Sequence, residues 1–346
     1  MLKHRLCIWF LFVTVLAYGQ TGGEHAFPFL DMAYNARSGA LGRHYIAFRD
    51  KDVNLAVNNP SLLYGEMHNT IGFSQALHAG GINHGMLTYG RKINDEITAS
   101  AHLRYVSYGK MDRTTPTGEV IGTFSAGDFI LGAGIAQQLN PRISIGANLN
   151  LIWSQLESFT SFGASVDLAG TYFDESERTT VTALVRNAGL QLKTYTDTER
   201  TPLPVNPMVA VSHRLQHAPF LFSIVAHSLN RWDLTYTDPN AQPTTNLLGE
   251  EIPVPVPGFG EKLARHFIFQ VEVLGGDVMR VRLAFDYQRR REFLVENRPG
   301  MAGFSTGVGF NFKRFSLDYG LVIYSSAGFN NLITLTTNMD KWKRSM

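Results

Sequence analysis

The connections between the expected strands of this chain alternate between short and long. Runs in which apolar and polar residues alternate recur from about residue 69 to residue 338. Most of these runs are long enough for a membrane strand, which needs about 9–11 residues when it is tilted in a bilayer. Outer-membrane barrels join such strands by short turns at one rim and by longer loops at the other. The pattern therefore predicts an all-β fold, a transmembrane β-barrel of antiparallel strands.

The alternation of side-chain character is clearest after the turn at Asn140-Pro141. From residue 143 to 153 every odd-numbered residue is apolar, and the even-numbered residues from 144 to 150 are serine, glycine and asparagine. The pattern returns in three later stretches, at residues 280–287, 304–312 and 315–323. Successive side chains of a strand point to opposite faces, so these strands have one apolar and one polar face. A barrel with lipid outside and a polar lumen explains both faces.

Counting these stretches predicts fourteen strands, an even number, as expected for a closed barrel whose two ends lie at one rim. The expected strands are 69–75, 82–92, 96–107, 128–139, 142–154, 161–173, 179–193, 205–215, 219–229, 264–274, 278–289, 302–312, 315–324 and 329–338. The connections after the even-numbered strands are all short: 93–95, 140–141, 174–178, 216–218, 275–277 and 313–314. The longest connections after odd-numbered strands are 108–127, 194–204, 230–263 and 290–301. We therefore expect the short turns to face the periplasm and the loops to face the cell exterior.

Residues 1–19 have the features of a secretory signal peptide. A basic start at residues 3–5 precedes an apolar run at residues 6–16, and the small residues Ala17 and Gly19 follow. The apolar run is too short for a transmembrane helix, which needs about 20 such residues. We therefore expect cleavage before Gln20 and localisation of the mature protein in the cell outer membrane.

Loss of the signal peptide would leave a chain with no net charge and no cysteine. It would remove Lys3 and Arg5 but no acid, which reduces 31 basic residues to 29 against 29 acidic ones. The one cysteine, Cys7, would be removed with them. A neutral chain gives no reason to expect nucleic-acid binding. A chain without cysteine excludes disulfides, thiol nucleophiles and cysteine-ligated metals.

Catalytic and metal-binding motifs have weak support in this chain. Ser107 and Lys110 match the S-x-x-K signature of penicillin-binding proteins, but the Lys-Thr-Gly element of that signature is missing and the expected context is a strand end. His213 and His217 have a spacing that zinc sites use on helices, whereas here they span a strand end and a turn. We therefore predict a protein that is not an enzyme and has no catalytic, cofactor or metal site.

The segment between the signal peptide and the first strand, residues 20–68, alternates poorly. Residues 33–42 could form a short amphipathic helix, and Asp52 could begin another that stops at Asn58-Asn59-Pro60. The segment could hang in the periplasm or enter the barrel. A fourteen-stranded barrel is wide enough to need filling, so a hatch or plug is the favoured interpretation. After the barrel, residues 339–346 are expected to form a short C-terminal tail.

The inward faces of the expected strands carry charges of both signs. Mutual pairing across a filled lumen explains this mixture more simply than an ion-selective pore does. The residues concerned are His102, Arg104, Asp167, Arg186, His266, Glu272, Arg280, Arg282, Asp286 and Asp318.

The longest expected loop, residues 230–263, is the main candidate for binding another protein. It combines aromatic residues with alternating prolines, which keep a chain extended without internal hydrogen bonds. The loop could be a stiff arm available to a partner or a lid folded across its own barrel, and both alternatives stay open. The residues expected to contact a partner are Trp232, Tyr236, Pro253, Pro255, Pro257 and Phe259.

Seven segments spread over the mature chain carry a family resemblance. They are Gly22–Leu30, Ala36–Gly42, Asp52–Asn54, Asn59–Leu63, Gly122–Ala126, His217–Phe220 and Trp232–Tyr236. They resemble the PorV/PorQ family, outer-membrane proteins of the Bacteroidetes type IX secretion system. That family is remotely similar to the long-chain fatty-acid transporters, whose barrels have fourteen strands and an N-terminal hatch. The resemblance therefore implies that residues 20–68 are a hatch.

The resemblance also implies membership of the cell-surface attachment complex. The partners there would be a PorZ-like surface protein and the PorU/PorV proteins, with outer-membrane lipid around the barrel. The main hypothesis is a non-enzymatic component of protein secretion that anchors the PorZ-like partner through its extracellular loops. The alternative is an outer-membrane transporter of hydrophobic small molecules such as long-chain fatty acids. The alternative predicts a lateral opening and an apolar pocket behind the hatch, and the mixed charges of the lumen speak against it.

Overall fold

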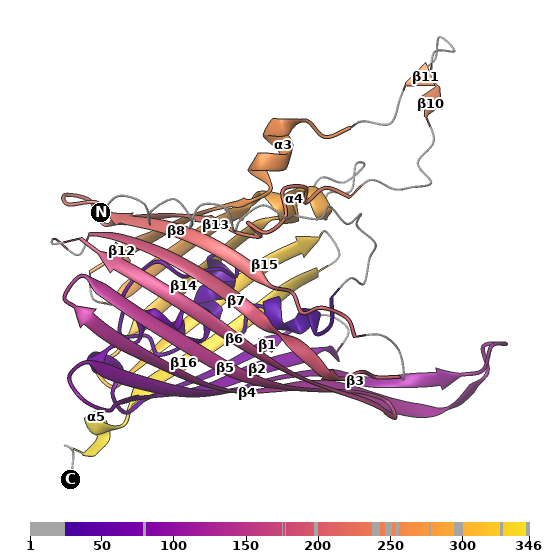
Figure 1. Ribbon diagram of the computed structural model, residues 1–346, viewed down its shortest axis with the longest axis horizontal. Helices are drawn as coiled ribbons and strands as arrows, with labels where there is room; N and C mark the ends of the chain where they lie inside the picture. Colours follow the sequence, from indigo (N-terminus) through magenta and orange to yellow (C-terminus); the bar gives the residue numbers. More distant parts are fainter. Residues whose placement is uncertain are drawn as a thin grey trace, which may run out of the picture.

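The strands of the computed structural model close into one antiparallel barrel of fourteen strands (Figure 1). The structure describes residues 25–78, 81–174, 176, 178–196, 200–236, 243–245, 251–252, 256–276, 278–293, 300–325 and 328–343. The barrel strands are β1 Thr70–Leu77, β2 Asn83–Lys92, β3 Ile97–Thr114, β4 Val120–Asn140, β5 Ile143–Leu156, β6 Phe159–Phe173, β7 Thr179–Lys193, β8 Asn206–Arg214, β9 Phe220–Ala226, β12 Phe267–Gly275, β13 Met279–Asp286, β14 Phe304–Asn311, β15 Phe315–Ser325 and β16 Gly328–Asn338. The predicted fold class is therefore confirmed.

Neighbouring strands of the barrel follow one another along the chain, with an exception at β9. That strand pairs with β12, because β10 (Thr244–Thr245) and β11 (Glu251–Ile252) form a separate two-stranded ribbon in the loop between them. Pairing of β1 with β16 closes the ring. A closed ring has no free sheet edge, so the strands can satisfy their backbone groups within hydrocarbon. None of the helices in the described ranges is long and apolar enough to cross a bilayer.

The two rims of the barrel differ in their connections. Short turns join the strands at the rim where β1 begins and β16 ends, which we call the turn rim. α5 (Asp340–Lys343) follows β16 there. The opposite rim, which we call the loop rim, carries α3 (Phe259–Ala264), α4 (Tyr287–Glu292) and the β10–β11 ribbon (Figure 1). In the predicted orientation the turn rim faces the periplasm.

The prediction of a long loop at residues 108–127 is wrong, because most of these residues extend β3 and β4. The two strands form a hairpin that projects beyond the loop rim (Figure 1). Gly109 has a φ of +76°, and the strand register shifts between Ser107 and Lys110. Gly109 therefore lies in a β-bulge, and the pairing of β3 with β4 continues beyond it. A glycine at a bulge and a glycine in a loop have the same local sequence signal.

The two faces of the wall follow the predicted alternation. In β5, Leu151 faces outward and is about half exposed, whereas the neighbouring Asn150 faces the lumen and is buried. Phe129, Trp153 and Phe162 from three successive strands form a row on the outer surface, with ring centroids 6.1 and 5.9 Å apart. An exposed apolar surface of this kind is suited to contact with lipid.

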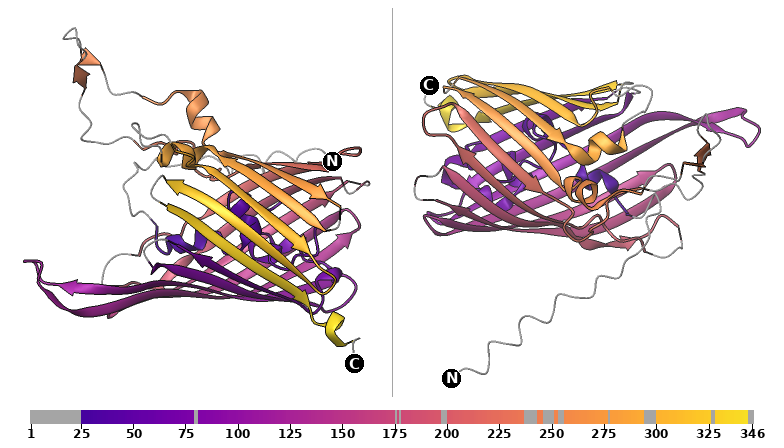
Figure 2. Two further views of the ribbon diagram at one scale, coloured as in Figure 1. Left: turned by 180° about the vertical axis from the view of Figure 1, so that it is seen from behind. Right: turned by 90° about the horizontal axis from the view of Figure 1, so that it is seen from above.

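Residues 25–68, which we call the N-terminal segment, run inside the barrel (Figure 2). Asn59 Nδ2 donates hydrogen bonds to the carbonyl oxygen of Ile46 at 2.7 Å and to Oγ1 of Thr171 on β6 at 3.2 Å. The segment is thus fixed both to itself and to the wall. Its elements are η1 Pro28–Asp31, α1 Ala36–Ala40, α2 Leu55–Asn58, η2 Pro60–Leu62 and η3 Gly65–Met67.

The helix expected at residues 33–42 is shorter than predicted. The side chain of Asn35 caps α1 by accepting a hydrogen bond from the backbone N of Ser38 at 2.8 Å. The chain then turns away at Gly42, whose φ is +72°. α2 ends before Asn59-Pro60, where the sequence places its stop.

Candidate functional site

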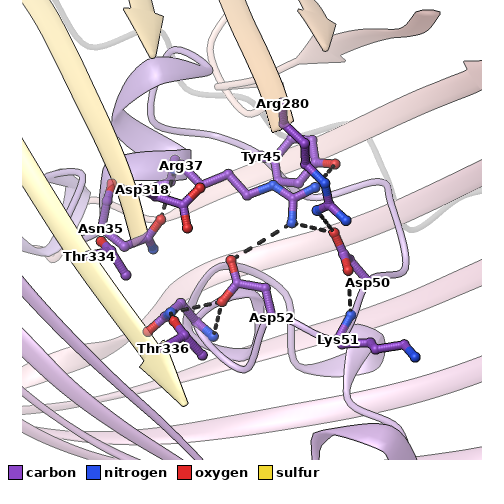
Figure 3. A network of polar contacts seen from close by, with 12 residues as sticks. Asn35, Arg37, Tyr45, Asp50, Lys51, Asp52, Arg280, Asp318, Thr334 and Thr336 are labelled. Atoms are coloured by element: carbon purple, nitrogen blue, oxygen red, sulfur yellow. Dashed lines mark hydrogen bonds and ion pairs between the residues drawn. The ribbon is translucent and has the colours of Figure 1, made fainter. Parts of the chain in front are cut away.

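A network of buried ion pairs joins the N-terminal segment to the wall in the half of the barrel nearer the turn rim. Arg37 of α1 donates from Nη1 to Asp50 Oδ2 at 2.7 Å (Figure 3) and from Nη2 to Glu272 Oε2 at 2.9 Å. Asp50 also pairs with Arg280 of β13, and Glu272 Oε1 accepts from Arg282 Nε at 2.9 Å. We call this network the ionic latch; its members are Arg37, Asp50, Glu272, Arg280, Arg282 and Asp318.

Each charged group of the ionic latch stabilises the charged form of its oppositely charged neighbours. Burial by itself would raise the pKa of Asp50, but the guanidinium groups of Arg37 and Arg280 hold that pKa below its usual value. Burial by itself would lower the pKa of Arg37, whereas Glu272 and the other acidic neighbours raise it well above its usual value. Both groups are therefore charged at neutral pH. Removing one member leaves a buried charge without its partner, which costs about 3–5 kcal/mol.

The predicted pairing of inward charges is confirmed only in part. Arg282 binds both Glu272 and Asp318 along the inner wall, as expected. Nearer the loop rim the prediction is confirmed for Asp286, whose Oδ2 lies 3.7 Å from Arg289 Nε. It is wrong for Arg104, because Arg104 Nη2 donates to the neutral Oδ1 of Asn150 at 2.9 Å. Hydrogen bonds to neutral groups are likewise made by His102, Asp167 and Arg186.

An apolar cluster fills the lumen toward the loop rim. The Phe27 and Phe29 rings lie 5.8 Å apart at the start of the N-terminal segment and are buried against the wall. Ile152 interrupts the polar inner face on which Asn150 precedes it, and this interruption is the signal in the sequence that could have located the cluster. We call the group the upper apolar cluster; its main members are Phe27, Phe29, Leu30, Met86, Val106, Ile130, Ile152 and Leu203.

Strand pairing in the wall is incomplete beside the upper apolar cluster. β8 pairs with β7 only from Thr179 to Arg186, although β7 continues to Lys193 along its other neighbour, β6. The chain that precedes β8 occupies the gap, and the backbone N of Ala26 donates to the carbonyl oxygen of Pro202 there at 2.9 Å. We call this place the β7–β8 seam. It is closed by a segment that is not a strand and by the start of the N-terminal segment.

Residues 230–236 fold against α3 above the loop rim, and we call the two together the cap. The Trp232 ring lies 5.2 Å from the ring of Phe259 and 5.9 Å from that of His266, measured between centroids. Lys262 Nζ of α3 forms an ion pair with Asp233 Oδ2 at 2.7 Å. This part of the loop therefore packs against α3 and the rim of its own barrel.

The structure brings together two of the residues predicted to contact a partner. Trp232 and Phe259 are in contact within the cap, and the exposed fractions of their side chains are 49% and 69%. Tyr236 is 65% exposed and Pro257 is partly exposed. Pro253 and Pro255 lie outside the described residues, so the prediction of a stiff proline arm stays untested. The expected cleavage site before Gln20 also lies outside them.

Comparisons with known proteins identify solved structures that share this fold. No family model matches this sequence, and no curated protein matches it. Among solved structures, the toluene transporter TodX of Pseudomonas putida is 12% identical, with 89% of this chain and 98% of that chain covered and a TM-score of 0.57. The toluene transporter TbuX of Ralstonia pickettii is 11% identical, with 89% and 99% covered and a TM-score of 0.52. Identities this low show a shared fold, and the chain has the barrel fold of an outer-membrane protein.

Proposed function

We propose that this chain carries hydrophobic small molecules across the outer membrane. This is the alternative function named in the sequence analysis, and the upper apolar cluster beside the β7–β8 seam is the observation that supports it. The apolar side chains Phe27 and Phe29 occupy space in the lumen that an apolar ligand could occupy in their place. Two proteins that share the fold are described as toluene transporters, which supports the same substrate class.

The ionic latch makes a sideways route more favourable than a straight one. An apolar molecule that moved on toward the turn rim would have to separate Arg37 from Asp50 and Glu272 and would offer no polar group in return. The seam lies directly beside the cluster and is not closed by strand pairing. The ligand therefore enters from the loop rim, displaces the start of the N-terminal segment and leaves through the seam.

A disulfide across the seam tests this route. The chain has no cysteine beyond the expected signal peptide, so a double variant Ala26→Cys/Pro202→Cys can form a single defined crosslink between two residues that are already hydrogen-bonded. We expect uptake of N-phenyl-1-naphthylamine by cells that carry the oxidised variant to fall at least about tenfold, because the start of the N-terminal segment can no longer move. Reduction with dithiothreitol should restore uptake.

A second disulfide serves as the matched control. Asn69 Nδ2 and Asp340 Oδ2 lie 2.9 Å apart at the turn rim, so Asn69→Cys/Asp340→Cys crosslinks the chain away from both the cluster and the seam. Uptake by this variant should not respond to oxidation. Equal uptake by the oxidised and reduced forms of the seam variant would rule out the proposed route.

The second candidate function is the anchoring of a PorZ-like surface protein in a type IX attachment complex. It rests on the family resemblance and on the aromatic surface of the cap, where Trp232 and Phe259 stand exposed together. Aromatic residues are enriched at the centres of protein interfaces. The further partners, the PorU/PorV proteins, are proposed on the resemblance alone.

Substitution of the cap aromatics tests the anchoring function. We expect Trp232→Ser/Phe259→Ser to reduce recovery of a co-expressed PorZ-like protein at least about tenfold, because loss of an interface anchor costs about 2 kcal/mol or more. Deletion of residues 246–260 should have the same effect. The control Val120→Ser/Ile121→Ser removes two exposed apolar side chains from the β3–β4 hairpin and should leave recovery unchanged. Unchanged recovery with both cap variants would exclude anchoring through this loop.

A further inference from the structure

A cavity of about 960 Å³ opens at the turn rim, beside the pocket that Arg37 and Asp50 of the ionic latch line. The turn between β6 and β7, the turn between β8 and β9, and the N-terminal segment line it. Neither the proposed transport route nor the cap uses this cavity. Its lining residues include Arg49, Tyr64, Phe173, Arg178, Arg214 and Leu274.

Two arginines that line this cavity lie side by side on neighbouring strands of the wall. Thr179 and Thr180 of β7 pair with His213 and Ser212 of β8, and the next position in this register sets Arg178 opposite Arg214. The backbone N of Arg214 donates to the carbonyl oxygen of Arg178 at 2.9 Å, which fixes this register. Two like charges directly opposite on paired strands repel each other. The repulsion disappears when an anion lies between the two guanidinium groups.

A third arginine reaches the cavity from the N-terminal segment. The guanidinium carbon of Arg49 lies 4.1 Å from the ring centroid of Phe173 and 5.0 Å from that of Tyr64. Among the described lining residues the carboxylate is that of Glu66, and Lys51 Nζ already pairs with it at 2.8 Å. The described lining thus has an excess of positive charge beside aromatic and aliphatic side chains.

We propose that this cavity is a binding site for a carboxylate attached to an apolar body. Each guanidinium of Arg178 and Arg214 carries a fork of N–H donors that matches a carboxylate, and guanidinium groups keep their charge at any physiological pH. Phe173, Tyr64 and Leu274 supply the surface for the apolar body. The carboxylate can belong to a free small molecule or to a peptide. The proposal does not depend on the transport function, because the site lies on the other side of the N-terminal segment from the upper apolar cluster.

Calorimetric titration of the full chain in zwitterionic nanodiscs tests the site. The probes are 3-phenylpropionate, its uncharged counterpart 3-phenylpropanol, and the peptide acetyl-Gly-Gly-Phe, whose C-terminal carboxylate adjoins an aromatic side chain. We expect saturable binding of 3-phenylpropionate and at least tenfold weaker binding to Arg178→Gln/Arg214→Gln. Arginine-dependent binding of acetyl-Gly-Gly-Phe alone also supports the site and identifies a peptide as its source of carboxylate. 3-Phenylpropanol should give no saturable binding.

The matched control removes the same amount of charge from the same rim. Arg91 and Lys313 are exposed near the turn rim and do not line the cavity, so Arg91→Gln/Lys313→Gln should bind each probe as the unaltered protein does. Faster migration of unheated samples in detergent gels verifies that both double variants keep a closed barrel. The proposal is overturned if neither carboxylate binds, or if the Arg178→Gln/Arg214→Gln variant binds as well as the control. Neither result changes the expected loss of uptake in the seam variant, so the cavity proposal and the transport proposal can fail separately.

Discussion

Replacing Arg37 by alanine is expected to free the N-terminal segment from the barrel while the barrel itself stays closed. The substitution takes one of two cationic partners from each of the buried Asp50 and Glu272, which keep Arg280 and Arg282, and breaking buried ion pairs in this way costs about 3 kcal/mol. A cysteine in place of Ser61, which is fully buried against β6, reports the opening, because the chain has no thiol beyond the expected signal peptide. Its maleimide labelling should become at least about a hundredfold faster, the factor that corresponds to about 3 kcal/mol.

Lys51→Ala is the matched control for Arg37→Ala. Lys51 belongs to the same segment and also forms an ion pair, with Glu66 at 2.8 Å, but both side chains are exposed. An exposed pair contributes at most about 1 kcal/mol, so labelling at residue 61 should change by less than about fivefold. Adding Glu272→Gln to Arg37→Ala should recover part of the loss, because it removes a buried carboxylate that has lost one of its two partners. Equal labelling of Arg37→Ala and Lys51→Ala would show that the latch does not hold the segment.

Replacing Gly146 by alanine is expected to loosen the same segment by a steric route. A Cβ atom at residue 146 would lie 2.5 Å from the carbonyl carbon of Pro60 and 2.5 Å from the backbone N of Ser61. Both contacts are with backbone, so no change of rotamer relieves them. Overpacking of this kind costs about 1–3 kcal/mol. Labelling of a cysteine at the buried Ser38 should rise about five- to a hundredfold.

Gly170→Ala is the control for the steric prediction. Gly170 lies on the adjacent strand β6, and a Cβ atom there meets nothing within 4 Å. The substitution removes the same backbone freedom from the unfolded chain without a contact in the folded one. Labelling at residue 38 should stay within about twofold of the unaltered protein. Similar labelling of the two alanine variants would mean that residue 60 does not press on the wall at Gly146.

The fold could be predicted because the residues of each membrane strand show by their polarity which face meets lipid and which face meets the lumen. Leu151 faces outward and Asn150 inward, so the period-two pattern carries both the strand and its orientation. The length of each connection then fixed the rim to which it belongs. The hairpin at residues 108–127 could not be predicted in this way. The bulge at Gly109 interrupts the regular alternation of apolar and polar residues, although the two strands stay paired.

The contents of the lumen could not be predicted in the same way. Arg37 and Glu272 are separated by 235 positions, yet they share one buried ion pair. A charge on an inward face shows that it needs a partner, but the sequence does not say which element supplies it. The same holds for Arg178 and Arg214, whose opposition depends on the register of two strands.

The alternation of short and long connections therefore determined the barrel, its strand number and the rim at which each loop lies, because these follow from residues adjacent in sequence. Only the tertiary structure decided that residues 25–68 run inside the ring, that an apolar cluster borders the β7–β8 seam, and that Trp232 lies against α3. Closure of the ring brings residues from distant strands around one lumen. Contacts across that lumen depend on shape and register, which no local pattern of residues encodes.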